Sequence, residues 1–142
     1  MKISIEMNQP TKMESDEITE WFLNGKVHRE DGPAVEWKHG LKEWYVNGLR
    51  HREDGPAMEW ESGAKRWYVD GKLHREDGPA VETKSGEKEW YVQGQQLTEK
   101  QFTERQKAQE EATPNKTSNV VLRMIQLRNK STSLNNIAKP SI

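Results

Sequence analysis

Cysteine is absent from this chain of 142 residues. Its absence excludes a disulfide scaffold, a thiol nucleophile and any metal site built on thiolates, and it is compatible with a reducing compartment. The chain also has no apolar run of signal-peptide length and no stretch of about 18 apolar residues that would span a membrane. The sequence therefore predicts a soluble, cytoplasmic protein.

Hydrophobic residues are scarce, at 32% of the chain, and the mean hydropathy is −1.10. A thick two-layer core would be hard to fill from this composition, so a thin, elongated sheet held by a few large side chains is expected. The tryptophans and tyrosines all lie between positions 21 and 91, which places the core in that region. They are Trp21, Trp37, Trp44, Trp60, Trp67, Trp90, Tyr45, Tyr68 and Tyr91.

A basic surface is also missing from most of the chain. Residues 1–112 hold 17 basic and 23 acidic groups, a net charge of −6, whereas residues 113–142 carry five basic groups and no acidic one. Nucleic-acid binding usually begins with a basic footprint, and anionic membranes repel an acidic body. No nucleic-acid partner is therefore expected, and membrane binding is disfavoured.

A repeat of 23 residues organises the aromatic part of the chain. One tryptophan returns at this interval, and the heptapeptide "HREDGPA" is written three times without substitution. The equivalent positions are Trp21, Trp44, Trp67 and Trp90, with the heptapeptide at 28–34, 51–57 and 74–80. Fixed-period self-similarity predicts an array in which each unit packs against its neighbours. We expect this array over residues 1–97, with units starting at 21, 44 and 67, a partial unit at 90 and a degraded half unit at 10–20.

The local signals inside each unit are those of short strands and turns. Asn-Gly at 47–48 and Asp-Gly at 70–71 stand between β-forming residues. They are the strongest short-range hairpin signal, because both turn residues must accept a positive φ. "KHG", "ESG" and "KSG" predict a second turn in successive units, and "EDGP" predicts a third bend. The expected fold is therefore mainly β, an antiparallel meander of short strands.

Two aromatic ladders follow from this assignment. Adjacent Trp44 and Tyr45 point to opposite faces if the segment is a strand, because side chains alternate with period two. Trp21, Trp44, Trp67 and Trp90 would then share one face, and Tyr45, Tyr68 and Tyr91 the other. Either one ladder is the core and the other a contact surface, or both are half-buried under helices or neighbouring turns; the sequence leaves both possibilities open.

A unit that runs aromatic residue, Asn-Gly-Lys, short strand, Asp-Gly or Ser-Gly, and Tyr or Trp again resembles the MORN (membrane occupation and recognition nexus) repeat. It is closest to the bacterial variant found in antitoxin-type proteins, and it also resembles tandem-repeat proteins common in bacteriophages and their hosts. The resemblance covers residues 10–97 and implies a twisted, elongated single-layer antiparallel β-meander extended by hairpins. "HREDGPA" departs from the closely spaced glycines of the common MORN unit.

A helix is expected directly after the array, over residues 98–112. Thr98 with Gln101 three residues later is a capping-box pattern at its start. Leu97 and Phe102 would pack on the open end of the sheet, leaving a largely charged helix surface outwards. Because a repeat array needs its last edge covered, capping is the expected role of this C-terminal helical extension.

The basic tail, residues 113–142, contains the most apolar segment of the chain. A short amphipathic helix is expected over 118–130, with Met124, Ile125 and Arg128 on roughly one face. Three roles for this helix stay open: folding back as core, self-association into a homo-oligomer, and insertion into a partner's groove.

Histidine beside glutamate and aspartate in "HREDGPA" suggests acid–base chemistry or a metal site. An active site is needed once, however, and this set occurs three times at identical spacing. Two strands per unit would hold equivalent residues about 9–10 Å apart, too far to share one metal. Since no Gly-rich phosphate loop, nucleophile elbow or HExxH motif occurs either, no catalytic residue, metal or cofactor is predicted. A structural corner is expected instead, kept identical because each corner must fit the next, with arginine paired to acids of its own or the next unit.

The function expected from these features is that of a non-catalytic protein-binding repeat module. Repeated aromatic and arginine side chains are good interface anchors. The phage-like repeat makes an inhibitor of a host or bacterial defence protein, acting in the host cytoplasm, the specific hypothesis. An antitoxin-like partner of a toxin enzyme is one alternative, and a small-molecule or nucleotide-binding protein that uses the aromatic face is another. The candidate contact residues are Tyr45, Tyr68, Tyr91, Arg29, Arg52, Arg75, His28, His51, His74, Met124, Ile125 and Arg128.

Overall fold

The structure is a computed structural model, and it describes residues 8–112. It is mainly β, with antiparallel hairpins in an open sheet and one C-terminal helix, which confirms the fold class expected from the sequence. The chain divides into two compact units, residues 1–100 and residues 101–142. We call the first unit the array.

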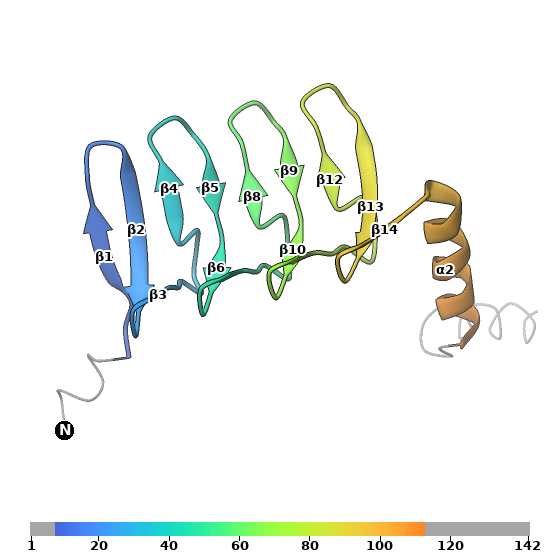
Figure 1. The fold of residues 1–142 in the computed structure, drawn as a ribbon, viewed down its shortest axis with the longest axis horizontal. Helices are drawn as coiled ribbons and strands as arrows, with labels where there is room; N and C mark the ends of the chain where they lie inside the picture. The colour runs from blue at the N-terminus through green and yellow to red at the C-terminus, as the bar shows by residue number, and fades with distance from the viewer. Residues whose placement is uncertain (1–7, 113–142) are drawn as a thin grey trace, which may run out of the picture. The chain divides into compact units, whose positions relative to one another are not determined.

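Short strands separated by tight turns make up the array. Each repeat supplies a long hairpin and, at its base, a short hairpin (Figure 1). The strands are β1 (Thr11–Glu14), β2 (Ile18–Leu23), β3 (Lys26–Val27), β4 (Val35–Trp37), β5 (Lys42–Glu43), β6 (Tyr45–Val46), β7 (Leu49–Arg50), β8 (Met58–Glu59), β9 (Lys65–Arg66), β10 (Tyr68–Val69), β11 (Lys72–Leu73), β12 (Val81–Glu82), β13 (Lys88–Val92) and β14 (Gln95–Leu97).

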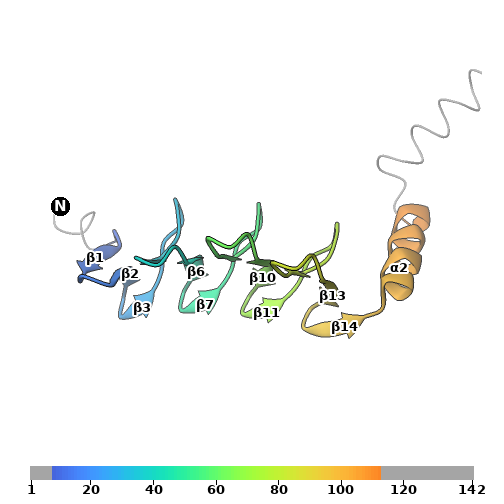
Figure 2. The same cartoon turned by 90° about the horizontal axis from the view of Figure 1, so that it is seen from above.

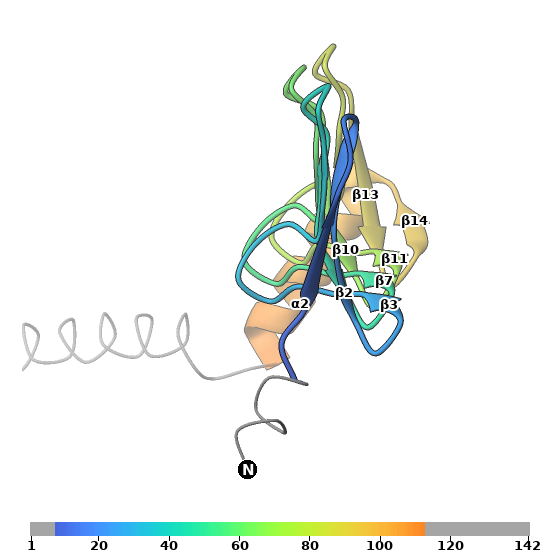
Figure 3. The ribbon, with the colours of Figure 1, turned by 90° about the vertical axis from the view of Figure 1, so that its left-hand side faces the viewer.

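The long hairpins join edge to edge into one sheet. Its strand order in the described part of the chain is β1-β2-β4-β5-β8-β9-β12-β13-β14, with β3 paired to β2, while β6–β7 and β10–β11 form separate two-stranded ladders. From above, the short hairpins recur at regular intervals along one side (Figure 2). Seen along the array, the long hairpins stand one behind another, and the short hairpins and connecting loops spread to opposite sides at their base (Figure 3). The array itself is thus a single layer.

The two-residue turns that close the short hairpins fix the register of each unit. Asn47 and Gly48 have φ values of 51° and 79°, as a type I′ turn requires, and Val46 pairs with Leu49 across them. The equivalent turns, each with two positive φ values, are Asn24-Gly25, Asp70-Gly71 and Gln93-Gly94. The hairpins expected at Asn-Gly and Asp-Gly are therefore present, and Gln93 adopts the same conformation although it tolerates it less readily.

One face of the sheet carries a row of alternating charge. Directly opposed residues on neighbouring strands share a face, and opposite charges there favour one register. Lys42 on β5 pairs with both Glu36 and Glu59, and the next lysine repeats the arrangement. The complete row is Glu14, Thr19, Glu36, Lys42, Glu59, Lys65, Glu82 and Lys88. Because a one-residue slip would move every side chain to the other face, this row specifies the strand pairing strongly.

The neighbouring row faces the opposite side and holds the apolar core. It consists of Glu20, Val35, Glu43, Met58, Arg66, Val81 and Glu89. Val35, Met58 and Val81 are each 6% exposed, and the alanines that precede them are fully buried. Every tryptophan and tyrosine of the array is only half-buried. Of the two possibilities for the aromatic ladders, half-burial of both is the one found, because a single layer has no second layer to cover large rings.

The C-terminal helix α2 spans Glu99–Ala112, where the sequence predicts a helix over 98–112. Phe102 is its buried residue, at 4% exposed. No helix in the described part of the chain is both long enough and apolar enough to cross a membrane. The helix predicted over 118–130 lies outside the described residues, and Met124, Ile125 and Arg128 lie outside them with it.

Candidate functional site

Each heptapeptide forms the corner between two successive long hairpins, and an arginine organises that corner. Cζ of Arg52 lies 4.0 Å from the centroid of the Trp44 ring. Its Nε donates to Asp54 Oδ1 at 3.0 Å, and its Nη1 donates to the carbonyl of Pro56 at 3.0 Å and to Glu59 Oε1 at 3.1 Å. A cation–π contact and charge-assisted hydrogen bonds thus hold the bend closed from within.

The same corner recurs in the other two copies with nearly the same distances. The stacked pairs are Arg29 on Trp21 at 3.9 Å and Arg75 on Trp67 at 4.0 Å. The hydrogen-bonded pairs are Arg29 with Asp31 at 2.9 Å and with Pro33 at 3.0 Å, and Arg75 with Asp77 at 2.8 Å and with Pro79 at 3.0 Å. Of the two pairings left open by the sequence, arginine therefore takes the acids of its own unit.

Close approach fixes the glycine and the alanine of the motif. A Cβ built on Gly55 would lie 2.9 Å from Cζ of Arg52, closer than real Cβ atoms come to other heavy atoms. Ala57 is 0% exposed, and its carbonyl accepts from the backbone N–H of Trp44 at 2.8 Å. Packing thus accounts for the glycine and the alanine of the motif.

Histidine joins each corner to the following unit. Nδ1 of His28 accepts a hydrogen bond at 2.9 Å from the backbone N–H of Asn47, the first residue of the next type I′ turn. The equivalent bonds are those of His51 with Asp70 at 3.1 Å and of His74 with Gln93 at 3.0 Å. Because Nδ1 of His28 accepts, the neutral ring carries its proton on Nε2, which lies 3.6 Å from Glu30 Oε1. At His51 the Asp70 carboxylate also lies 3.2 Å from Nδ1.

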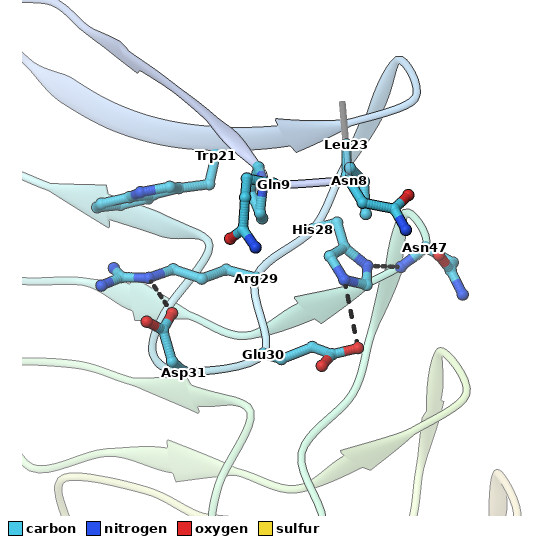
Figure 4. Close-up of a pocket in the computed structure, with 10 residues that line it drawn as sticks. Asn8, Gln9, Trp21, Leu23, His28, Arg29, Glu30, Asp31 and Asn47 are labelled. Carbon is cyan, nitrogen blue, oxygen red and sulfur yellow. Dashed lines mark hydrogen bonds and ion pairs between the residues drawn. The ribbon is translucent and has the colours of Figure 1, made fainter. Parts of the chain in front are cut away.

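Three equivalent clefts, which we call the corner clefts, lie along the row of corners. Their volumes are about 640, 780 and 710 Å³. Each is lined by the tryptophan of its unit, the aliphatic residue two positions later, and the His, Arg, Glu and Asp of the heptapeptide. The shared sets are Trp21, Leu23 and 28–31; Trp44, Val46 and 51–54; and Trp67, Val69 and 74–77. The second and third clefts are also lined by residues of the preceding corner, 29–32 and 52–56, whereas the first is lined by 8–10 and Asn47. In the first cleft Arg29 lies beside Trp21 and Asp31, whereas His28 points towards Asn47 and Glu30 (Figure 4).

Carboxylates form the exposed rims of the corner clefts. The arginine side chains of the three corners are 21–23% exposed and the histidines 7–19%. By contrast, the aspartates are 84–86% exposed, and the glutamates 81%, 84% and 47%. The repeat pattern favours the histidines and arginines as contact residues, and it does not single out these carboxylates. A count of charges in "HREDGPA" is the signal that points to them, because each copy adds two acids and one arginine.

The tyrosines lie on the face of the sheet opposite the corner tryptophans, where a buried carboxylate accepts several hydrogen bonds. Glu43, 6% exposed, accepts from Trp37 Nε1 at 3.2 Å, from Tyr45 OH at 2.9 Å and from Arg50 Nε at 3.1 Å. Burial, followed by the hydrogen bond and charge of Glu43, raises the pKa of Tyr45 to about 12. Cζ of Arg50 lies 5.5 Å from the Tyr45 ring centroid and 5.7 Å from that of Tyr68.

The tyrosine surroundings differ from unit to unit. Tyr91 donates to Glu89 Oε2 at 3.1 Å, and desolvation together with that carboxylate raises the pKa of the phenol. In the middle unit Arg66 stands at the position that Glu43 and Glu89 occupy in their own units, and its Cζ lies 5.3 Å from the Trp60 ring centroid. The corner clefts therefore keep the repeat period in their chemistry, and the tyrosine face does not.

A glutamate carboxylate lies near the histidine of each corner. Nε2 of each corner histidine lies 3.5–3.7 Å from a glutamate oxygen, longer than a direct hydrogen bond. Among residues 8–112 no three His, Asp or Glu side chains converge on a point that could hold a metal ion. Comparison with family models, curated proteins and solved structures finds no match for this chain. The MORN resemblance therefore remains a prediction from the residues alone.

Proposed function

We propose that this chain is a non-catalytic protein-binding module that docks its partner on the corner clefts. Their repetition is the observation that carries the proposal, because in three consecutive units the cleft contains the same tryptophan and the same His, Arg, Glu and Asp of the heptapeptide. Repeat arrays use regular surfaces of this kind to bind extended partners. Since arginine and histidine hold the corners in place, the carboxylates are presented by a pre-organised frame, which reduces the entropic cost of binding.

The proposed partner carries basic side chains on an extended segment. Glu30 and Asp31 of the first corner are 81% and 84% exposed, and each corner adds a net negative charge. Two strands per unit space the clefts about 9–10 Å apart, a distance that about three residues of extended chain span. In the polyproline II conformation, which has three residues per turn and a rise of about 3.1 Å per residue, lysine or arginine at every third position would point to the same side. These side chains would reach successive rims and lay their aliphatic stems against the tryptophans.

The resemblance to phage and host repeat proteins supplies the specific form of this proposal. It favours an inhibitor of a host or bacterial defence protein, and an antitoxin-like partner of a toxin enzyme is the second form. Both share the docking surface described above, and they differ in the identity of the captured protein. A nucleotide ligand is disfavoured, because its phosphates would meet the exposed carboxylates of the rims.

Charge reversal on the rims tests the proposal. The rim variant changes Glu30, Glu53 and Glu76 to lysine, and the matched control changes Glu17, Glu61 and Glu87, exposed residues near the tips of long hairpins, in the same way. Proteins captured from a bacterial lysate by wild-type chain are identified by mass spectrometry and titrated calorimetrically with each variant. We expect the rim variant to lose affinity by at least about tenfold, while the control, with the same net charge, retains it.

Two outcomes would contradict the proposal. Equal affinity of the rim variant and the wild type would remove the corner clefts from the interface. A metabolite released from the denatured protein, with no stoichiometric protein captured, would instead support the small-molecule alternative.

A further inference from the structure

Strand β1 forms the N-terminal edge of the sheet. Among residues 8–112 it pairs only with β2, and all four of its residues are exposed. An edge strand presents a row of backbone N–H and C=O groups that can pair with another strand. Natural proteins usually protect such an edge from pairing with other strands. The side chains of β1 determine which strand could pair with it.

The backbone groups of Lys12 and Glu14 are directed towards the open side of β1. The N–H of Ser15 donates to the carbonyl of Ile18 at 2.9 Å, across the turn that joins β1 to β2. Because the residues of an antiparallel pair alternate between hydrogen-bonded and non-hydrogen-bonded positions, Met13 bonds β2 in the same way. Lys12 and Glu14, at the intervening positions, therefore face outwards with both their N–H and their C=O.

Met13 is an apolar side chain in a row that is buried elsewhere in the array. It stands opposite Glu20, which in turn stands opposite Val35, so it continues the core row described above. Val35, Met58 and Val81 in that row are each 6% exposed, whereas Met13 is 60% exposed. The core row thus ends at β1 with an uncovered apolar side chain.

We propose that two copies of this chain pair through their β1 edges, antiparallel about a two-fold axis that passes between the two Met13 residues. In this register Lys12 stands opposite Glu14 of the partner subunit and Glu14 opposite Lys12 of the partner subunit. Both are hydrogen-bonded pairs of the new ladder, and both join opposite charges. The two Met13 side chains meet at the non-hydrogen-bonded position between them, where side chains approach most closely.

The neighbouring register is disfavoured by charge. Centring the axis on Lys12 would place two lysines opposite each other, and like charges at directly opposed positions repel. The register centred on Met13 is also closed, because the same patch is used by both copies, so association stops at a dimer. A contact of four residues per chain lies below the about 1,200 Å² of a standard interface, so the dimer is weak and forms at high protein concentration.

Complementary charge reversals test this dimer in the full chain. Sedimentation equilibrium of wild-type protein is expected to show reversible dimerisation. Lys12→Glu places glutamate opposite glutamate, and Glu14→Lys places lysine opposite lysine, so each single variant is expected to raise the dimer dissociation constant at least about tenfold. An equimolar mixture of the two single variants restores opposite charges at every pair and is expected to form a heterodimer. The double variant Lys12→Glu/Glu14→Lys should dimerise like the wild type.

A control variant and three contrary outcomes complete the test. Lys84→Glu makes the same charge change at an exposed position outside β1 and should leave dimerisation unchanged. Circular dichroism shows whether each variant keeps its fold. A wild-type chain that stays monomeric at millimolar concentration overturns the proposal, and so does a dimer that both single variants retain. A dimer lost on Met124→Glu but retained by Lys12→Glu also overturns it and moves the contact to residues 118–130.

Discussion

At the scale of single residues, the heptapeptide is a set of contacts fitted around one arginine. Asp54 and the carbonyl of Pro56 accept hydrogen bonds from Arg52. Gly55 has no Cβ, which leaves room for the guanidinium beside it. His28 in the first copy acts between units, because it accepts from the backbone of Asn47. Residues that resemble catalytic machinery in the sequence are therefore engaged in holding the fold.

Gly55→Ala tests the central contact of the corner. The new Cβ would displace the Arg52 guanidinium from its hydrogen bonds and its stacking on Trp44, so we expect the free energy of unfolding to fall by about 1–2 kcal/mol. In an Arg52→Ala background the same alanine should cost nothing, because it then only restricts the unfolded chain. Urea unfolding of the four proteins in this cycle measures the coupling. Equal costs in both backgrounds would show that the glycine serves another purpose.

At the scale of elements, each short hairpin after the first is bound by the unit before it. The backbone N–H of Arg29 donates to the carbonyl of Tyr45 at 3.0 Å, and the N–H of Gly48 donates to the carbonyl of Val27 at 2.9 Å. The imidazole of His28 adds a third bond to the turn between these two points. The type I′ turn is thus held by its own sequence and by its neighbour, which explains why both the turn and the histidine recur together.

His28 should tolerate asparagine better than leucine. Asn Oδ1 occupies nearly the place of imidazole Nδ1 and can accept from the Asn47 N–H, whereas leucine leaves that donor without a partner at a part-buried position. We expect His28→Leu to lower the free energy of unfolding by about 1–3 kcal/mol and His28→Asn to lower it by less. Chemical denaturation followed by tryptophan fluorescence provides the measurement. Equal losses for the two variants would assign the cost to side-chain packing instead of the hydrogen bond.

At the scale of the whole molecule, the array is held together by contacts within each unit and between neighbouring units. The hydrogen bonds of each corner reach its own unit and the next one, as those of Arg52 and His28 show. In such a one-dimensional arrangement stability is close to a sum over units and their interfaces. The number of corner clefts is then adjustable without redesign of any unit.

Removal of residues 51–73, one full period, should therefore leave a folded, shorter array. The join places Glu82 opposite Lys42 and Val81 opposite Glu43, which keeps the charge row and the core row in register. We expect a native-like circular dichroism spectrum and a smaller urea m-value, because less surface is buried. An unfolded product would mean that Arg66 or another feature of the middle unit is needed for the whole array.

The period, the turns and the antiparallel meander were predictable because they are local properties. Asn47-Gly48 carries its own conformational preference, and equal spacing of Trp44 and Trp67 shows that units are equivalent. The burial of the aromatic ladders was not predictable in the same way. It depends on whether a second layer exists, and a composition that fills only one layer leaves the rings half-buried and stacked with arginine.

The contacts of the corner residues could be predicted only in part, for a geometric reason. The hydrogen-bond partner of His28 is a backbone N–H 19 positions later. No local sequence pattern predicts this contact, because it forms only when units stack. The rim carboxylates Glu30 and Asp31 were overlooked because the sequence shows which residues repeat and does not show which of them face solvent. The exposure of each side chain separates the groups that hold the corner from those that face solvent.

Strands at equivalent positions of different units can pair in the same register, which affects how the chain folds during synthesis. Lys42 and Glu43 find acceptable opposites in Glu59 and Met58 of β8, and equally in Glu82 and Val81 of β12. A refolding chain can therefore skip a unit and leave it looped out, the kind of misassembly known for repeat proteins. On the ribosome β8 emerges before β12, so the correct neighbour is the first to arrive. Folding during synthesis, from the N-terminus onwards, thus favours β8 over β12 as the neighbour of β5.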